Sequence, residues 1–439
     1  MSAVLSPSAD APRPLGREDY KTLGLSALGG TLEFYDFVIF VFFTVTIGHL
    51  FFPPDMPEWL AQLQTLGIFA AGYLARPLGG IIIAHFGDRL GRKRMFALSV
   101  FLMALPTFII GILPTYGAIG VAAPLLLLLM RILQGAAIGG EMPGAWVFVA
   151  EHVPRERYGL GIGVLTAGIT GGILLGAIVA IIINRSYSPA EVLDFAWRIP
   201  FILGGVFGFI AVYLRRFLSE TPVFKELAAK RELARELPVK TVIREHRQAC
   251  LITAGLTWTL STAIVVIILM TPSMLQRLYG IPAPAALEAN CVAILMLTIG
   301  CALFGWLNDR IGTRATLVIA WGGLAVSAYA FYIGLAPGIG EAELMLRYGV
   351  AGLFCGAIST VPIVATRAFP PPIRFSGLSF SYNVAYAVFG GITPVLTQFW
   401  LQHDRLAPAH YVSATVLLAI VLAAFPLTAR GWRPAPAGR

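Results

Sequence analysis

Apolar residues along the chain gather in long runs, and short polar segments separate one run from the next. These runs recur from end to end and exceed 18 residues, the length that an α-helix needs to cross a bilayer. The pattern therefore predicts an all-α membrane protein with twelve transmembrane helices. The expected spans are 24–51, 59–85, 95–113, 120–150, 158–184, 197–218, 248–272, 284–307, 316–335, 343–368, 374–401 and 409–429.

The only long polar stretch between two runs covers 219–248 and divides the twelve spans into two sets of six. Two loop sequences of the first set recur in the second. The sequence "GDRLGRKR" from Gly87 returns as "NDRIGTRA" from Asn308, and "PRER" after the fourth span returns as "PPIR" after the tenth. The chain is therefore a duplicated six-helix unit. Its expected parts are an N-terminal tail (1–20), a first half (21–218), a linker (219–247), a second half (248–429) and a C-terminal tail (430–439).

Charge predicts the orientation of these helices. Lys and Arg concentrate in one set of loops, for example 89–94 and 219–248, whereas Asp and Glu concentrate in the opposite set, for example at Glu341 and Glu343. Loops rich in Lys and Arg stay in the cytoplasm. We therefore expect both termini to be cytoplasmic.

Composition excludes several other classes of protein. The 439 residues are 57% hydrophobic and 13% charged, too few charges for a soluble chain of this length. The net charge of +9 sits in short loops, so it indicates orientation and not nucleic-acid binding. The four cysteines form no C-x-x-C pair, and G-K-[ST] does not occur. We expect no metal, no nucleotide, no cofactor and no enzymatic site.

A few charged residues interrupt the apolar runs, and these are candidates for function because a charge inside a bilayer is costly. Glu33 and Asp36 lie three residues apart in "LEFYDF", on one face of the first span. Burial and mutual repulsion favour keeping one of them protonated. Arg131 lies near the middle of the fourth span, at a similar depth, and Glu141 follows ten residues later. We assign proton coupling to these four residues.

Alternatives remain for these charges. One of the two acids could serve only helix packing, bonded to the backbone or to Tyr35. Arg131 could form a purely structural ion pair, or it could bind a substrate carboxylate. Arg76, in "GYLARPLGG", either extends to the cytoplasmic surface or meets Glu141.

The spans of the second half carry hydrogen-bonding and aromatic residues in place of charges, and these suit a substrate-binding wall. The residues that we assign to substrate binding are Arg131, Tyr35, Trp258, Tyr382, Asn383 and Tyr386. The aromatic members could instead be packing residues.

Several motifs in this order resemble one family of carriers. They are "LEFYDF", "ARPLGG", "GDRLGRKR", "RILQGAAIGGE", "WRIPF", "RRFLSETPVF" and "SYNVAYAVFGGITP". Together they resemble the metabolite/proton symporters of the major facilitator superfamily, which include carriers of citrate, 2-oxoglutarate, shikimate, and proline or betaine. The resemblance covers nearly the whole chain, and it implies the major facilitator fold.

The resemblance also implies a cytoplasmic latch between the halves. In it, Asp88 lies at the start of the eleventh span and Arg92 pairs with an acid at the end of the fourth, for which Glu151 is the match. Asp309 is the counterpart of Asp88 in the second half.

We expect a monomeric secondary transporter of the bacterial inner membrane that imports a small organic acid, a mono-, di- or tricarboxylate, together with protons. One alternative is proton symport of a zwitterionic osmolyte such as proline or betaine. The family's osmolyte carriers often have long charged C-terminal extensions, and this chain stops soon after its last span. A second alternative is a drug/proton exporter.

Overall fold

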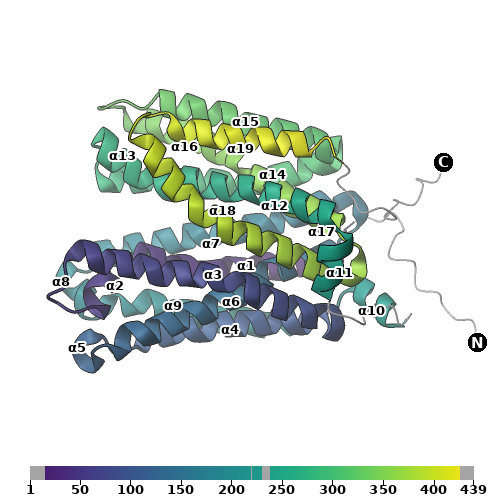
Figure 1. Ribbon diagram of the computed structural model, residues 1–439, viewed down its shortest axis with the longest axis horizontal. Coiled ribbons are helices and arrows are strands. Elements are labelled where there is room, and N and C mark those ends of the chain that lie inside the picture. The colour runs from purple at the N-terminus through teal and green to yellow at the C-terminus, as the bar shows by residue number, and fades with distance from the viewer. Residues whose placement is uncertain (1–14, 219, 230–237, 426–439) are drawn as a thin grey trace, which may run out of the picture.

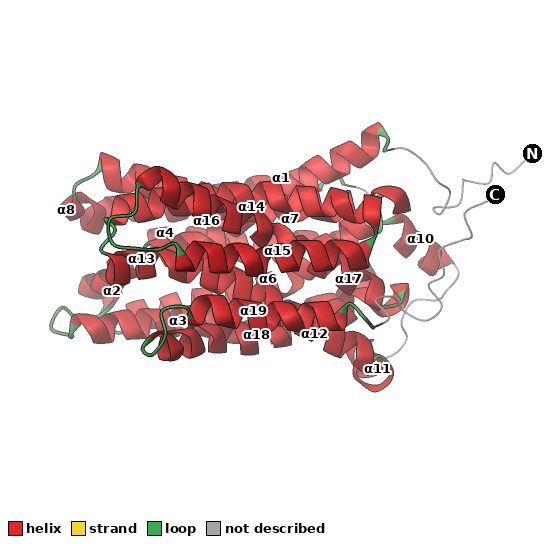
Figure 2. Ribbon diagram, turned by 90° about the horizontal axis from the view of Figure 1, so that it is seen from above, coloured by secondary structure: helices red, strands yellow, loops and turns green. Residues whose placement is uncertain are grey.

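The computed structural model describes residues 15–218, 220–229 and 238–425. Within these residues the chain forms helices and loops and no strand. The helices run side by side along one direction, with loops at both ends (Figures 1 and 2). Ten of them are long and apolar enough to cross a membrane.

Twelve spans form two successive sets of six, as the hydropathy pattern predicts. The first set consists of α1 (Arg17–Phe42) continued by α2 (Thr44–Phe51), α3 (Glu58–Leu90), α4 (Arg92–Ile112), α6 (Ala122–Ala150), α7 (Tyr158–Ser186) and α9 (Arg198–Arg215). Short helical segments join them at α5 (Tyr116–Ile119), η1 (Arg155–Arg157), α8 (Pro189–Glu191) and η2 (Val192–Ala196).

The second set begins after two short helices, α10 (Pro222–Ala229) and α11 (Pro238–Glu245). Its spans are α12 (Arg247–Thr262) continued by η3 (Ala263–Met270) and α13 (Thr271–Tyr279), α14 (Ala283–Ile311), α15 (Thr313–Ile333), α16 (Glu341–Cys355) continued by η4 (Gly356–Ser359) and α17 (Thr360–Ala368), α18 (Arg374–Leu401) and α19 (Ala407–Leu422). The short segment η5 (Pro371–Ile373) precedes α18. The residue boundaries that we assigned to the two halves, the linker and the tails stay predictions.

The seventh span is longer than its apolar pattern suggests. It was expected to end at 272, but it continues through a π-helical stretch at 263–270 and ends only at Tyr279. Gly280 then adopts φ +65°, a left-handed conformation that terminates helices and that glycine accepts most readily. Because residues 272–279 include several polar ones, hydropathy does not predict this last part of the helix.

The internal repeat of the sequence is also a repeat of backbone geometry. Gly91 ends α3 with φ +117°, and Gly312 ends α14 with φ +85°. Both values lie where a side chain is strongly disfavoured, which explains the glycine that follows Asp-Arg-x in each loop. Each half thus turns from its second to its third span in the same way.

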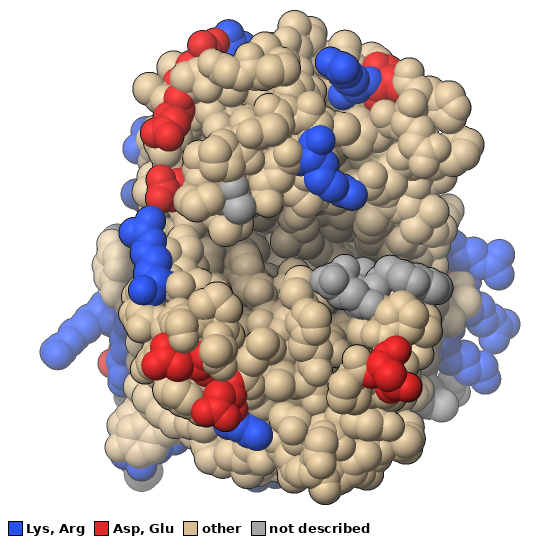
Figure 3. All heavy atoms as spheres, turned by 90° about the vertical axis from the view of Figure 1, so that its left-hand side faces the viewer, with Lys and Arg blue, Asp and Glu red and all other residues tan. Residues whose placement is uncertain are grey.

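The two halves lie side by side and are hollowed between them at one end. In Figure 1 the first half is purple to blue and the second green to yellow, and α7 and α14 lie where they meet. The helices α10 and α11 lie at the end of the molecule where α1 begins and α19 ends (Figures 1 and 2). Figure 3 views the opposite end and shows a central depression, which we term the hollow. By the charge rule, the hollow opens away from the cytoplasm.

Small residues allow the central helices to approach closely. A Cβ atom on Gly305 of α14 would collide with the carbonyl oxygen of Gly159 of α7. One turn further along α7, a Cβ atom on Gly163 would lie 2.6 Å from the carbonyl oxygen of Cys301. Such contacts are the means by which helices associate in lipid, where apolar packing against a neighbour gains little over lipid tails.

This packing predicts the effect of adding one methyl group at Gly305. We expect Gly305→Ala to push α7 and α14 apart and to lower the free energy of unfolding by about 1–3 kcal/mol, the usual effect of overpacking. The measurement is the apparent melting temperature of the purified protein in detergent. Gly322→Ala on α15 is the control, because the space around Gly322 is open. Equal melting temperatures for the two variants would contradict the close approach.

Candidate transport site

Asp36 is buried within the first half. Its exposed fraction is 1%, and its carboxylate points at two glycines of α9. A Cβ atom on Gly204 would lie 2.5 Å from Asp36 Oδ1, and one on Gly208 would lie 3.1 Å from Oδ2. Glycine at both positions therefore makes room for the acid between α1 and α9. The side chain of Glu33 lies outside the described residues, so the expected pair of acids stays a prediction.

Arg131 reaches the surroundings of Asp36 through two polar side chains that the sequence analysis did not identify. The Arg131 guanidinium is fully buried, lies 4.2 Å above the ring of Phe40, and donates to Gln134 Oε1 at 2.9 Å. Gln134 in turn donates to Thr107 Oγ1 at 2.6 Å. Thr107 and Asp36 both border Gly204, so one buried polar path extends from the arginine to the edge of the acid's pocket. Residues three apart on α6 could have suggested Gln134, but nothing local in the sequence marks Thr107.

In this structure Tyr35 packs between helices, and its expected role in substrate binding stays a prediction. It is fully buried in the first half, its hydroxyl donates to the carbonyl oxygen of Pro200 at 2.9 Å, and its ring meets Phe207 edge-on. These contacts join α1 to α9. Tyr35 is thus a packing residue in this structure.

Asn383 of α18 forms a hydrogen bond that joins the second half to the first. Its Nδ2 donates to the carbonyl oxygen of Gly139 on α6 at 2.6 Å, and Ser379 Oγ donates to the same oxygen at 3.1 Å. Gly80 of α3 completes this contact, because a Cβ atom there would lie 2.6 Å from Asn383 Nδ2. In this conformation the amide closes the interface; its role as a substrate ligand stays a prediction.

The interface of α3 and α6 with α18, which we term the seam, contains a cluster of tyrosines around a cation. The Cζ atom of Arg76 lies 4.5 Å from the ring centre of Tyr386, 5.4 Å from that of Tyr73 and 5.8 Å from that of Tyr382. The rings of Tyr73 and Tyr386 lie parallel with their centres 5.8 Å apart. Arg76 is 2% exposed and donates to Met142 Sδ at 3.6 Å. It therefore turns to the seam and does not extend to the cytoplasmic surface.

Trp258 lies within the second half. Trp258 of α12 stacks on Phe389 of α18 with ring centres 4.2 Å apart, and its Nε1 donates to Tyr411 at 3.0 Å. The pair is half-buried and belongs to the second half alone. Glu141 is buried in α6, with an exposed fraction of 4%. Its assignment to proton coupling stays a prediction.

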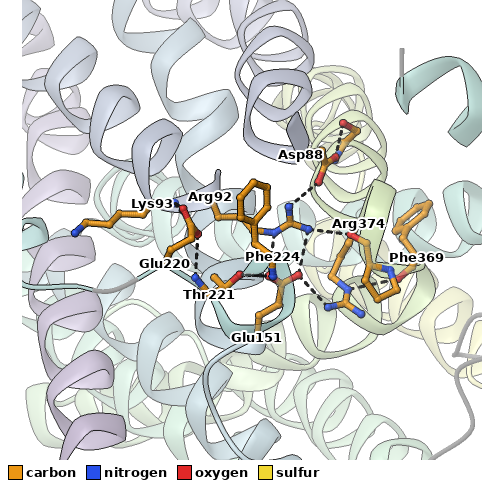
Figure 4. A network of polar contacts seen from close by, with 11 residues as sticks. Asp88, Arg92, Lys93, Glu151, Glu220, Thr221, Phe224, Phe369 and Arg374 are labelled. Carbon is orange, nitrogen blue, oxygen red and sulfur yellow. Dashed lines mark hydrogen bonds and ion pairs between the residues drawn. The ribbon is translucent and has the colours of Figure 1, made fainter. Parts of the chain in front are cut away.

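The end of the seam that lies towards α10 and α11 contains a buried network of charges (Figure 4). Arg92 Nε lies 2.9 Å from Glu151 Oε2, and Arg92 Nη1 lies 3.2 Å from Asp88 Oδ1. From the second half, Arg374 Nη1 lies 3.1 Å from Glu151 Oε1. All four side chains are almost inaccessible to solvent. The ion pair of Arg92 with Glu151 is the one that the resemblance implies.

Acids also bind the first backbone amides of a helix in the opposite half. Asp88 Oδ2 accepts from the backbone nitrogen of Ser376 at 2.9 Å and from its hydroxyl at 2.7 Å, at the start of α18. Asp309 accepts from the backbone nitrogens of Gly159 and Leu160 at 2.7 and 2.8 Å, at the start of α7. A carboxylate at a helix N-terminus is stabilised by unpaired amides and by the helix dipole. Each half thus ties the other at this end.

The sequence analysis missed three partners of this network. They are Arg374, Thr221 and Glu220. Thr221 Oγ1 donates to Glu151 Oε2 at 2.7 Å, and both Glu220 oxygens accept from the backbone nitrogen of Lys93 at the start of α4. The motif "RRFLSETPVF", which includes Glu220 and Thr221, entered the analysis only as a family resemblance. The cytoplasmic latch that the sequence predicts at Asp88, Arg92, Glu151 and Asp309 stays a prediction. Below, the latch means these four residues together with Arg374 and Thr221.

If the latch holds the cytoplasmic end closed, the loss of one of its charges should open that end. Removing one partner of a buried ion pair destabilises a structure by about 3–5 kcal/mol. We therefore expect Glu151→Gln to open the cytoplasmic end and to speed alkylation of a cysteine placed at Ser379, with the four native cysteines replaced. The control is Glu156→Gln, because Glu156 lies in the adjacent loop and is exposed. Identical alkylation rates in the two variants would contradict the role of Glu151 in holding the cytoplasmic end closed.

Comparison with known proteins agrees with this architecture. The family model described as Major Facilitator Superfamily matches residues 36–394. The "Proline/betaine transporter" of Salmonella typhimurium is 31% identical over 416 residues, which cover 91% of this chain and 82% of that protein. The "Putative proline/betaine transporter" of Staphylococcus aureus is 31% identical over 411 residues, which cover 92% of this chain and 87% of that protein.

Solved structures show the same fold. The proton:xylose symporter XylE, bound to 6-bromo-6-deoxy-D-glucose, superposes with a TM-score of 0.79 at 18% identity, over 93% of this chain and 95% of that one. The xylose transporter XylE from E. coli in a partially occluded inward open conformation gives a TM-score of 0.69 at 16% identity, over 97% of this chain and 100% of that one. The protein belongs to the major facilitator superfamily and is a multi-pass transporter of the bacterial inner membrane, not an enzyme.

Proposed function

We propose that this protein is a proton-coupled symporter that imports a small zwitterion such as proline or betaine by alternating access of its two halves. The sequence alone favoured an organic acid and kept the zwitterion as an alternative. The similarity to proline/betaine transporters, over more than nine-tenths of the chain, supports the alternative better.

The observation that carries this proposal is the tyrosine cluster in the seam. A zwitterion such as betaine combines a carboxylate with a cationic nitrogen. A carboxylate binds best to a guanidinium, and a quaternary nitrogen binds to the faces of aromatic rings. The seam offers both within a few ångströms, because the Arg76 guanidinium lies 4.5 Å from the centre of the Tyr386 ring. The contacts of these rings with Arg76 show that aromatic faces in the seam accept a cation.

Proton coupling is proposed for Asp36. Its carboxylate lies in a pocket lined by Gly204 and Gly208, where water is scarce, and the path from Arg131 through Gln134 and Thr107 ends beside that pocket. A change in the charge around Arg131 would reach Asp36 along this path. Binding of the solute and binding of the proton would then favour each other, which is the thermodynamic requirement for symport.

An organic acid remains the second candidate, and one observation favours it. Tyr73 lies close enough to both Arg76 and Arg131 to interact electrostatically with each of them. Two buried guanidinium groups in the neighbourhood of one side chain would suit a solute with two carboxylates. The uptake experiment below includes such solutes for this reason.

The proposal predicts that Asp36→Asn separates transport from accumulation. Proteoliposomes with an imposed proton gradient should concentrate labelled proline or betaine through the unmodified protein. We expect the Asp36→Asn variant to exchange labelled for unlabelled solute across the membrane without concentrating it, because its amide cannot carry a proton. The control is Asp194→Asn, since Asp194 is exposed in the short helical segment η2 before α9 and lies outside the proposed path.

Two results would contradict the proposal in different ways. Undiminished proton-driven accumulation by Asp36→Asn would move the proton site to Glu33 or Glu141. Uptake of a di- or tricarboxylate by the unmodified protein, with no uptake of proline or betaine, would replace the zwitterion with the organic acid.

A further inference from the structure

Arg76 is fixed in the seam by the crossing of α3 over α6. A Cβ atom on Gly139 of α6 would collide with the carbonyl oxygen of Arg76, and one on Gly135 would collide with that of Gly72. With the backbone so tightly held, the Arg76 side chain lies between Met142 of α6 and Tyr386 of α18. The residue is 2% exposed.

Among the residues that the structure describes, no carboxylate forms an ion pair with the Arg76 guanidinium. Among the described residues, its contacts are the rings of Tyr73, Tyr382 and Tyr386 and the sulfur of Met142. Its Nε atom is buried and makes no hydrogen bond in this part of the chain. Aromatic faces attract a cation but do not neutralise it, so a guanidinium this deeply buried calls for an anion. A ligand with a carboxylate would supply one.

The position of the cluster places it where a transported solute would arrive. Along α18, Ser376 binds the latch, Ser379 and Asn383 bind Gly139, and Tyr386 lies beside Arg76. Ser376 and Tyr386 are ten residues apart, which corresponds to about 15 Å of helix. Arg76 therefore lies on the side of the Asn383 contact that faces away from the latch, towards the end of the molecule that carries the hollow (Figure 3).

We propose that Arg76 binds the carboxylate of the transported solute, with Tyr386 and Tyr73 holding the guanidinium in place. A carboxylate would meet the guanidinium through two parallel hydrogen bonds. Because Arg76 belongs to α3 and Tyr386 to α18, a carboxylate on Arg76 would bind a side chain that contacts both halves. This assignment rests on the proposed function only in requiring that the solute carry a carboxylate.

The test compares betaine with choline, which keeps the trimethylammonium group and lacks the carboxylate. Binding to the purified protein is measured by titration calorimetry and by the shift in melting temperature. The unmodified protein should prefer betaine. Arg76→Gln should weaken betaine binding about 10–100-fold, as expected for loss of hydrogen bonds to a charged group, and should leave choline binding unchanged.

Two further variants separate a binding role from a structural one. Arg76→Lys keeps the charge but loses the planar fork, so betaine binding should fall while the fold is kept; this variant decides the question if Arg76→Gln does not fold. Arg185→Gln is the matched control, because Arg185 pairs with Glu288 across the same two halves but is exposed. Its betaine affinity should equal that of the unmodified protein.

The outcomes distinguish this inference from the proposed function. Equal betaine affinity in the unmodified protein and in a folded Arg76 variant would overturn the inference, whereas proton-driven uptake of proline or betaine by the unmodified protein would still support the proposed function. If the unmodified protein binds a di- or tricarboxylate in place of proline and betaine, the proposed solute is wrong, and the same variants are then compared with that acid and its amide. If no solute with a carboxylate binds, both proposals fail.

Discussion

The closed, cytoplasmic end of the molecule depends on the ion pairs and the hydrogen bond that the Glu151 carboxylate accepts. It is buried and is shared by Arg92 of the first half, Arg374 of the second half and Thr221 of the segment that leads to the linker. Taking charges out of water costs several kcal/mol for each ion unless good partners are present. Each of these side chains is therefore stable in its place only while the others stay. Separation of the halves at this end breaks the Glu151–Arg374 pair and the contact of Asp88 with Ser376, and water must then replace both.

Successive contacts along α18 connect that network to the transport site. Beyond the latch, Asn383 and Ser379 press α18 against Gly139, and beyond these lie the tyrosines around Arg76. The contacts change from ionic to hydrogen-bonded to aromatic with distance from the cytoplasm. A solute bound at the aromatic layer would lie directly against the part of the seam that must open next. This order gives the halves a physical reason to respond to the solute, because the same helix carries every layer.

The sequence predicted the transmembrane spans and the residues of local motifs. It did not predict contacts that form only where helices distant in the sequence pack together. Hydropathy located the twelve spans, and the motif around Asp88 and Arg92 led to Glu151. Arg374 was missed because it meets Glu151 from 223 positions further along the chain, and no local pattern marks such a pair. The hydrogen bond from the Tyr35 hydroxyl to Pro200 could not be predicted for a similar reason, since it depends on the packing of α9 against α1.

The central claim is that the two ends of the molecule open in alternation, with the latch holding one end closed. Distances between spin labels at both ends test it most directly. One pair would join Arg94→Cys and Arg314→Cys at the starts of α4 and α15, and a second would join Asp55→Cys and Gln402→Cys at the opposite end; all four positions are exposed. Double electron–electron resonance would then be recorded with and without solute at a fixed pH. The account predicts that solute lengthens the first distance in a fraction of molecules and shortens the second in the same fraction. Distances that change in the same direction at both ends, or that ignore a solute shown to bind, would contradict it.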